Sequence, residues 1–190
     1  MNIHGILLAA GSAQRFGAQK LLHTLDDDTP MAVAAARRLL AVLPEAVAVV
    51  RSDATDVKRA LSAAGMRIVE NPDAARGIGT SVACGVAHNP GAEACVVALA
   101  DMPFLTASSI AAVCAALEDG APLAAPRYRG QRGHPVGFAC DYFDELLVQK
   151  SDIGARQVLV RHARRLHCID VQDPGVVRDI DTLADLRDLP

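Results

Sequence analysis

The amino-acid sequence predicts an α/β fold, a mostly parallel sheet with helices on both faces. Short apolar runs alternate with helical stretches up to residue 126, which is the pattern of repeated βαβ units. Hydrophobic residues make up 51% of the 190 residues, enough for a substantial core. Aromatic residues are only 3%, with no Trp, so this core is expected to consist of Ala, Val and Leu, as in layered α/β proteins.

The predicted strands are short apolar runs bounded by polar or turn residues. We expect them at residues 3–10, 46–50, 66–70, 94–100 and 122–126. The run at 94–100 is the most continuous, which is typical of a central strand buried on both faces.

Helices are expected between these strands, joined by right-handed connections. Their predicted ranges are 30–43, 53–65, 79–88 and 106–120. Pro30 suits a helix start, and Asp53 and Thr106 suit N-caps. Gly65 and Gly120 suit helix ends.

The regular alternation of predicted strands and helices ends after residue 126. The glycine-containing stretch 127–139 is interpreted as a β excursion, and the acidic stretch 23–30 as a solvated turn. The remaining elements are expected as helices at 141–150 and 155–165, a strand at 166–171 and a closing helix at 182–189. No repeat or linker is visible, so residues 1–190 are expected to form a single domain.

Composition excludes several classes of function. The net charge of -3 and the few aromatics argue against binding to nucleic acid, and the basic stretch 161–165 is interpreted as a solvated helix end. No secretion signal is visible, and the apolar stretch 104–117 is too short to cross a bilayer. The five cysteines form no C-x-x-C pair and are expected mainly as small core residues in a reducing compartment. We therefore expect a cytoplasmic protein without a membrane partner.

A glycine-rich stretch with two cations directly follows the first predicted strand. It contains Gly11, Ser12, Arg15, Gly17 and Lys20. Ligands of open α/β sheets bind at the carboxyl ends of the strands, where glycines let backbone amides approach anions. Arginine and lysine grip phosphate oxygens, so the stretch is interpreted as a triphosphate-binding loop. It is neither a Walker A loop nor a G-x-G-x-x-G fingerprint.

Carboxylates are expected at the same edge. Asp101 directly follows the run 94–100, and Thr106 already serves as the next helix cap. Asp179 and Asp181 precede the last predicted helix, which either of them, or Thr182, could instead cap. A nucleoside triphosphate arrives with Mg²⁺, which takes hard oxygen ligands, usually one or two carboxylates.

Six stretches, in order along nearly the whole chain, resemble the molybdenum cofactor nucleotidyltransferases (MobA-like NTP transferases), above all the molybdopterin cytidylyltransferases. They are "LLAAGSAQRFGAQKLL", "NPDAARGIGTSVACG", "ALADMPFL", "RGQRGHPVGF", "SDIGARQVL" and "DIDTLADL". Ala9-Ala10-Gly11 is similar to the sequence in cytidine users, where guanosine users have "AGG". The stretch "LADMPF" does not fit the "H-D-x-x-R-P" pattern of the diphosphocytidyl-methylerythritol synthases.

This resemblance implies a Rossmann-like three-layer nucleotidyltransferase fold, glycosyltransferase-A-like, and Mg²⁺-dependent transfer of CMP from CTP to molybdopterin with release of pyrophosphate. It implies nucleotide contacts from Ala9, Ala10, Gly11, Ser12, Arg15, Lys20, Asn71, Gly77, Ser81 and Asp101. Arg15, Lys20 and Asp101 would be catalytic, Asp101 and Asp181 would hold the metal, and His134, Asp152 and Arg156 would face the acceptor.

Two departures concern the expected site. Met102 stands where the family usually has glutamine, and Ser151 stands where it usually has glycine, beside the expected acceptor contacts. Two other functions stay open, a nucleotidyltransferase for a sugar phosphate or isoprenoid precursor, and a non-catalytic cofactor-binding chaperone of molybdoenzyme maturation. The presence of both Asp101 and Asp181 argues against a purely binding role. A client molybdoenzyme or its chaperone would be a further partner.

Overall fold

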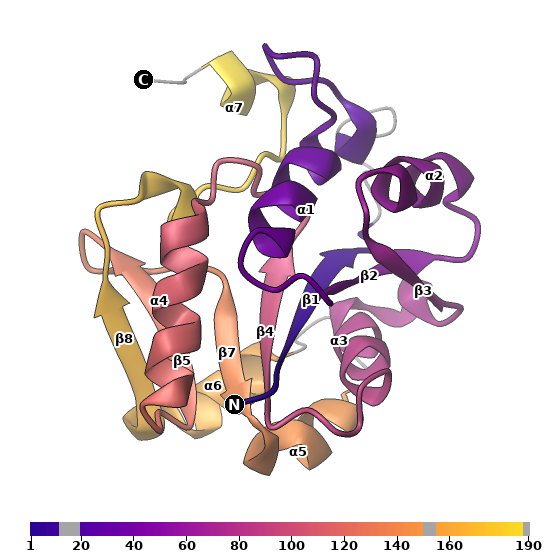
Figure 1. Ribbon diagram of the computed structural model, residues 1–190. Coiled ribbons are helices and arrows are strands. Elements are labelled where there is room, and N and C mark those ends of the chain that lie inside the picture. Colours follow the sequence, from indigo (N-terminus) through magenta and orange to yellow (C-terminus); the bar gives the residue numbers. More distant parts are fainter. Residues whose placement is uncertain (12–19, 150–154, 188–190) are drawn as a thin grey trace.

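A computed structural model describes residues 1–11, 20–149 and 155–187. Within them lies one sheet of eight strands in the order β3-β2-β1-β4-β7-β5-β6, with β8 pairing with β5 (Figure 1). The strands are β1 (Ile3–Ala9), β2 (Val47–Arg51), β3 (Arg67–Asn71), β4 (Ala94–Leu99), β5 (Leu123–Tyr128), β6 (Gln131–Arg132), β7 (Val136–Ala139) and β8 (Leu166–Asp170). The α-helices are α1 (Met31–Leu40), α2 (Thr55–Ala63), α3 (Ile78–Ala87), α4 (Ala107–Glu118), α5 (Phe143–Leu147), α6 (Arg156–Arg161) and α7 (Leu183–Arg187).

The sheet is mostly parallel. β1 pairs in parallel with β2 and β4, β2 with β3, and β5 with β8. β7 runs antiparallel between β4 and β5, and β6 is antiparallel to β5. In Figure 1, α1 and α4 lie in front of the sheet and α6 lies behind it. The predicted α/β class with helices on both faces is confirmed.

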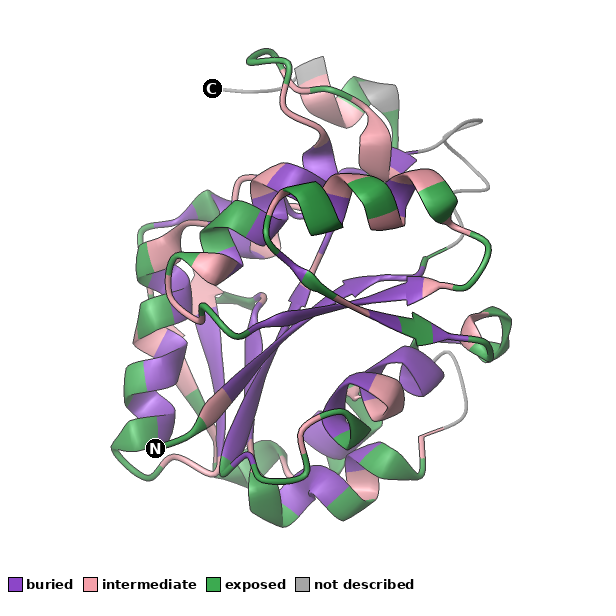
Figure 2. Ribbon diagram, turned by 45° about the vertical axis from the view of Figure 1, so that its right-hand side comes forward, coloured by how far each residue is buried: buried purple, intermediate pink, exposed green. Residues whose placement is uncertain are grey.

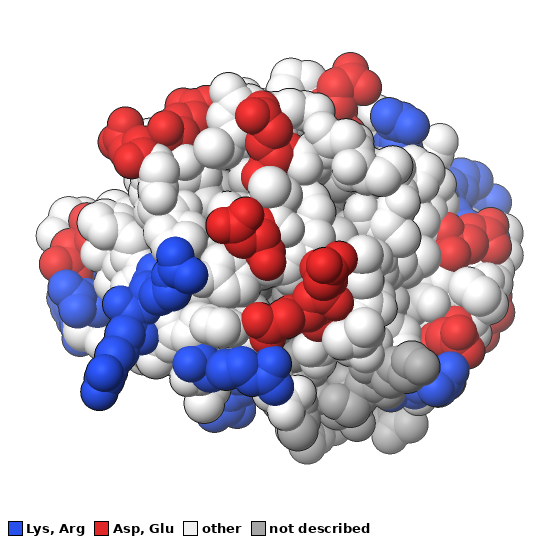
Figure 3. Space-filling view, turned by 90° about the horizontal axis from the view of Figure 1, so that it is seen from below, with Lys and Arg blue, Asp and Glu red and all other residues white. Residues whose placement is uncertain are grey.

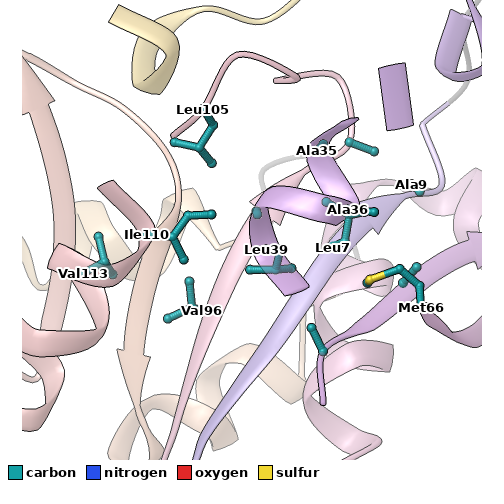
Figure 4. Close-up of a cluster of buried hydrophobic side chains, with 14 of the residues drawn as sticks. Leu7, Ala9, Ala35, Ala36, Leu39, Met66, Val96, Leu105, Ile110 and Val113 are labelled. Carbon is teal, nitrogen blue, oxygen red and sulfur yellow. The ribbon is translucent and has the colours of Figure 1, made fainter. Parts of the chain in front are cut away.

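Two apolar layers hold the helices against the sheet. Because side chains alternate along a strand, Leu7 and Ala9 of β1 face the layer that includes α1, α2 and α4 (Figure 4). Ile6 and Leu8 face the layer that includes α3, α5 and α6. Figure 2 shows the strands buried between these helices. Because β4 is buried on both faces, its sequence is a continuous apolar run. Its predicted central position in the sheet is confirmed.

Most predicted helix boundaries are confirmed, and one predicted cap is wrong. The Thr106 side chain accepts a hydrogen bond from Ser109 N at the start of α4, as predicted. Gly65 and Gly120, just past α2 and α4, have the positive φ angles of helix ends. Asp53 does not cap α2, because its carboxylate accepts two hydrogen bonds, 2.9 and 2.7 Å long, from the Arg51 guanidinium.

The later elements agree with the predicted β excursion, which forms β6 and β7. Cys95 and Cys114 are buried as predicted, whereas the prediction is wrong for Cys140, which is exposed where the 3₁₀ helix η3 (Cys140–Tyr142) begins. The acidic residues Asp26, Asp27 and Asp28 are exposed, as expected for a solvated turn.

The surface opposite the carboxyl ends of the parallel strands carries both acidic and basic side chains (Figure 3). Arg161, Arg164 and Arg165 are exposed at the end of α6 and in the following 3₁₀ helix, as predicted for a solvated helix end.

Within the described residues, no helix is long and apolar enough to cross a membrane.

The strand order reverses between β1 and β4. The chain leaves β1 toward β2 and β3 on one side, and later returns to β4 on the other. Leu8 of β1 pairs in register with Leu99 of β4, so the segments that follow both strands leave the sheet at the same edge. Such a reversal opens a crevice at the carboxyl ends of the strands, where ligands of open α/β sheets bind.

Candidate active site

Lys20 joins two aspartates at this edge of the sheet. Its Nζ lies 3.0 Å from Asp101 Oδ2 and 2.8 Å from Asp181 Oδ1. The Lys20 side chain is 10% exposed, whereas the aspartate side chains are 29% and 55% exposed. Burial alone lowers the pKa of Lys20, but the hydrogen bonds and charges of Asp181 and Asp101 outweigh burial and raise that pKa. The ammonium is therefore a fixed counter-ion for two carboxylates.

Three separate parts of the chain supply this group. Lys20 begins the short 3₁₀ helix η1 (Lys20–Leu22), which packs against α1. Asp101 lies in the turn after β4, where Ala100 N donates to Leu8 O of the neighbouring strand. Asp181 comes from the segment before α7, which is held at the sheet edge by a hydrogen bond from Ile180 N to Asp101 O. The structure thus brings Asp101 and Asp181, both singled out in the sequence, together on one lysine.

Asn71, Thr80 and Ser81 form a second polar group, where β3 leads into α3. Asn71 Nδ2 donates to Thr80 Oγ1 and Ser81 Oγ, and Asn71 Oδ1 accepts from the backbone N–H of Asp73. Asn71 and Ser81 are only 3% and 2% exposed. Gly77, which precedes α3, has a φ of 122° that residues other than glycine rarely adopt. This network fixes the loop before α3.

His134 lies in the turn between β6 and β7. Its Nδ1 is buried and has no hydrogen-bond partner among the described residues. Burial and the charge of Arg132 lower the pKa of His134 to about 4, although Asp101 and the Val97 backbone oppose this shift. The ring is therefore neutral at pH 7, with a lone pair or a proton available at Nδ1.

The remaining predicted site residues are only partly described. Ser12, Arg15, Gly17 and Asp152 lie outside the described residues. Ala9 and Ala10, at the end of β1 and just after it, are buried, and Gly11 is exposed. Arg156 is exposed at the first position of α6.

Comparison with known proteins identifies the family. Residues 5–166 match the MobA-like NTP transferase domain. The chain belongs to this family. A MobA-like NTP transferase domain over most of the chain makes the protein a nucleotidyltransferase, and the fold agrees with the resemblance in the sequence.

Two curated relatives are similar to this MobA-like NTP transferase over nearly their full lengths. Nicotine blue oxidoreductase of Paenarthrobacter nicotinovorans is 28% identical over 193 residues, which cover 97% of this chain and 94% of the relative. Molybdenum cofactor cytidylyltransferase of Escherichia coli K12 is 25% identical over 181 residues, which cover 95% of this chain and 91% of the relative. The names of these two relatives denote different activities.

Solved structures agree with the fold. Rv0371c from Mycobacterium tuberculosis H37Rv superposes on this MobA-like NTP transferase with a TM-score of 0.80 and 26% identity, covering 98% of this chain and 95% of the other. A complex of Rv0371c with manganese gives a TM-score of 0.78 and 23% identity, covering 98% and 97% of the two chains.

The donor chemistry of the site fits a divalent metal ion. Asp101 and Asp181 already direct oxygens at one shared cation, the Lys20 ammonium. Mg²⁺ usually takes one or two carboxylates and completes its octahedral shell with water and substrate phosphates. No group of three or more His, Cys, Asp or Glu that could hold a metal occurs in the described part of the chain. The two carboxylates therefore suit a metal ion whose remaining ligands are water and the phosphates of a nucleotide.

Two features of the MobA-like NTP transferase site were not predicted from the sequence. The pairing of Lys20 with both aspartates was missed, because the pattern of the loop indicated only a phosphate ligand. Asp173 was also missed, although it is a buried carboxylate in the segment that carries Asp181. The only available signal was its position in the stretch "QDPG", which is typical of a turn.

Proposed function

We propose that this protein is a Mg²⁺-dependent cytidylyltransferase that transfers CMP from CTP to molybdopterin and releases pyrophosphate. The observation that carries the proposal is the convergence of Asp101 and Asp181 on Lys20 at the carboxyl ends of β1 and β4. Two anions and a cation at the strand-order reversal suit the binding of a metal with a triphosphate. The proposal treats residues 1–190 as a single nucleotidyltransferase domain.

The nucleotide is proposed to lie across the loop that follows β1. Gly11 is exposed, so its backbone amide can face an anion without the obstruction of a side chain. Lys20 neutralises triphosphate oxygens once its carboxylate partners are taken by the metal. Ser12 and Arg15 are assigned to the same phosphates by their resemblance to the family loop.

Asp101 and Asp181 would hold the Mg²⁺. When bound, the metal neutralises phosphate charge and polarises the phosphorus that is attacked. These carboxylates come from two parts of the chain, the turn after β4 and the segment before α7, which the hydrogen bond from Ile180 N to Asp101 O holds together. The manganese complex of Rv0371c adds support for a divalent ion at a related fold.

The reaction is a single displacement at the α-phosphorus of CTP. An oxygen of the terminal phosphate of molybdopterin forms the new bond to phosphorus, and the bond from the α-phosphorus to the bridging oxygen of the β-phosphate breaks. That oxygen leaves with pyrophosphate, and no covalent enzyme intermediate is needed. The protein contributes positioning and charge neutralisation, for which Arg15 and Lys20 are the proposed groups.

Other residues are proposed to contact the base and the acceptor. Asn71, Gly77 and Ser81 are proposed to shape the base and ribose region; the Asn71 amide acts indirectly, since its hydrogen bonds go to Thr80, Ser81 and Asp73. His134, Asp152 and Arg156 are proposed to face the acceptor. The neutral ring of His134, with Nδ1 unpartnered among the described residues, supports a hydrogen bond to the bound acceptor.

The decisive experiment measures pyrophosphate release by the purified protein with CTP, molybdopterin and Mg²⁺. The same assay is run with GTP and ATP, with a sugar phosphate and an isoprenoid phosphate as acceptors, and without any acceptor. We expect acceptor-dependent release with CTP and molybdopterin, loss with excess chelator, and loss in Asp101→Ala. Mass spectrometry of the product distinguishes cytidylyl transfer from hydrolysis.

Release that requires a different acceptor would assign the protein to that substrate class and overturn the molybdopterin proposal. No release with any pair, combined with tight binding of the pterin, would favour a cofactor-binding chaperone.

A further inference from the structure

A buried carboxylate lies outside the group that the sequence singled out. Asp173 is 8% exposed and accepts four hydrogen bonds. Its Oδ2 accepts from Thr106 N at 2.9 Å, Thr106 Oγ1 at 2.7 Å and Ser109 Oγ at 2.7 Å. Its Oδ1 accepts from Gly175 N at 2.8 Å. Burial raises the pKa of Asp173, but these bonds outweigh burial and lower that pKa, so the carboxylate is ionised in the folded protein.

These bonds connect two distant parts of the chain. Thr106 and Ser109 belong to the start of α4, just after Asp101, whereas Asp173 begins the segment that ends in Asp181. The contact joins residues 67 positions apart. A charge-assisted anchor thus lies at one end of the segment whose other end carries a proposed metal ligand.

Close backbone packing holds the segment between Asp173 and Asp181. A Cβ on Gly175 would lie 2.3 Å from Phe104 O, so only glycine fits against the turn that follows Asp101. His134 N donates to Val176 O at 2.7 Å, and Ile180 N donates to Asp101 O at 3.0 Å. The segment therefore touches both the β4–α4 turn and the β6–β7 turn.

We propose that Asp173 is a positioning residue that sets Asp181 against Lys20 and Asp101. The inference rests on the proposed function only for the role of Asp181 as a metal ligand. Asp173 ties the segment to α4, which begins just past Asp101. The positions of Asp101 and Asp181 are thereby fixed relative to each other. The four hydrogen bonds of Asp173 all come from protein groups, so the role proposed for it is to position Asp181 and not to bind the metal.

Asparagine cannot replace Asp173 without loss. All four partners of the carboxylate are donors, three at Oδ2 and one at Oδ1. Either orientation of an amide would point its NH₂ group at one or more N–H or O–H donors. Asp173→Asn therefore keeps the shape of the side chain while it weakens the anchor.

The first test follows Lys20 directly and requires no metal or nucleotide. The full-length protein is treated with an acetylating reagent, and mass spectrometry gives the modification rate of each lysine. Lys20 is protected by burial and by its two aspartates. In Asp173→Asn its rate should rise by about tenfold, because weakening hydrogen bonds to a charged group shifts a local equilibrium by about that factor. The rate at Lys58, which pairs with Glu70, serves as the internal reference.

The matched control is Asp179→Asn, the same chemical change at an exposed position of the same segment. It should leave the Lys20 rate unchanged. If Asp173→Asn leaves the Lys20 rate unchanged in a folded protein, or if both variants raise it equally, the proposal is overturned.

The second test measures binding of Mn²⁺ without nucleotide, by electron paramagnetic resonance of the free ion. Asp173→Asn should weaken binding and raise the KM for Mg²⁺ more than it lowers kcat, since a displaced ligand is recovered at high metal concentration. Asp181→Asn tests the proposed function itself. If Asp181→Asn leaves Mn²⁺ binding intact, the metal assignment fails, whereas the Lys20 rates still decide the role of Asp173.

Asp173→Asn is checked for folding by circular dichroism and thermal unfolding. If it does not fold, Ser109→Ala and Thr106→Val each remove one hydroxyl donor to Oδ2 and keep the carboxylate. Both should raise the Lys20 rate in the same direction by a smaller factor. A folded pair of variants with parental Lys20 rates would overturn the proposal.

Discussion

Lys20 Nζ lies 2.8 Å from Asp181 Oδ1, so a proposed phosphate ligand is bound to a proposed metal ligand. The same ammonium donates to Asp101 Oδ2 at 3.0 Å. We therefore expect a divalent cation that binds both carboxylates to compete with the ammonium, because both cations are attracted by the same two side chains. A displaced Lys20 would be free to meet a phosphate that arrives with the metal.

This competition predicts opposite effects of Lys20→Met on two measurements. Without nucleotide, Mn²⁺ should bind more tightly, because the competing charge is gone; partial exposure of the carboxylates screens the gain to about tenfold. Nucleotidyl transfer should slow, because the triphosphate loses its cation, and Lys20→Arg should not fully restore it. Titration with Mn²⁺ and a pyrophosphate assay measure the two effects. Lys58→Met, on a surface pair, is the control, and weaker Mn²⁺ binding in Lys20→Met would contradict the competition.

Asp101→Ala should abolish turnover and leave the fold intact. The side chain is 29% exposed, so its removal leaves no large cavity. Loss of a key electrostatic group in an active site costs about a hundredfold or more in rate. Steady-state kinetics and thermal unfolding are compared with those of Asp179→Ala, which removes an exposed carboxylate near the same edge. Parental turnover in folded Asp101→Ala would remove Asp101 from the mechanism.

The sequence predicted the order of the elements because burial leaves a local pattern. β4 is buried on both faces and reads as one apolar run, and Thr106 precedes α4 as a typical cap. The edge at which Asp101 lies followed from the same pattern, since parallel strands end together.

Side-chain partners were harder to predict than elements. Asp53 had the spacing of an N-cap, but Arg51 offers a bidentate pair that no periodicity reveals. Lys20 and Asp181 are 161 residues apart, and the long separation hides their contact from any local pattern. Asp173 and Thr106 are hidden in the same way, so positioning groups emerge only when the fold brings the segments together.

His134 predicts a dependence of stability on pH. Burial and Arg132 lower its pKa from 6.5 to about 4, against the opposing charge of Asp101. As the pH falls below 6.5, His134 binds a proton in the unfolded state but stays neutral in the folded state. The contribution of neutral His134 to the free energy of unfolding is thus fully present above pH 6.5. It is lost between pH 6.5 and 4, at up to about 1.4 kcal/mol per pH unit.

Urea unfolding of the parent and of His134→Gln across this pH range isolates the effect, because the carboxylates that also titrate are common to both proteins. The stability difference between the parent and His134→Gln should shift against the parent as the pH falls. A difference that is constant with pH would mean that His134 titrates normally in the folded protein.

The last prediction concerns the base of the nucleotide and starts from Ala10. This residue directly follows β1 and is 8% exposed, beside the exposed Gly11 that is proposed to approach the nucleotide. Beside a bound nucleotide, its methyl group would favour the smaller pyrimidine, whereas glycine would open room and backbone freedom for a purine. One methyl group usually discriminates by only about 1–3 kcal/mol, so Ala10 is expected to bias the choice of base without deciding it alone.

The parent should have a higher kcat/KM for CTP than for GTP, and Ala10→Gly should narrow that gap mainly by raising kcat/KM for GTP. Thermal unfolding of the variant checks that the added backbone freedom has not loosened the loop and β1. A parent enzyme that prefers GTP would overturn both the base assignment and the steric argument, whereas a CTP preference that Ala10→Gly leaves unchanged would move the selectivity to the loop before α3, where Asn71 and Ser81 lie.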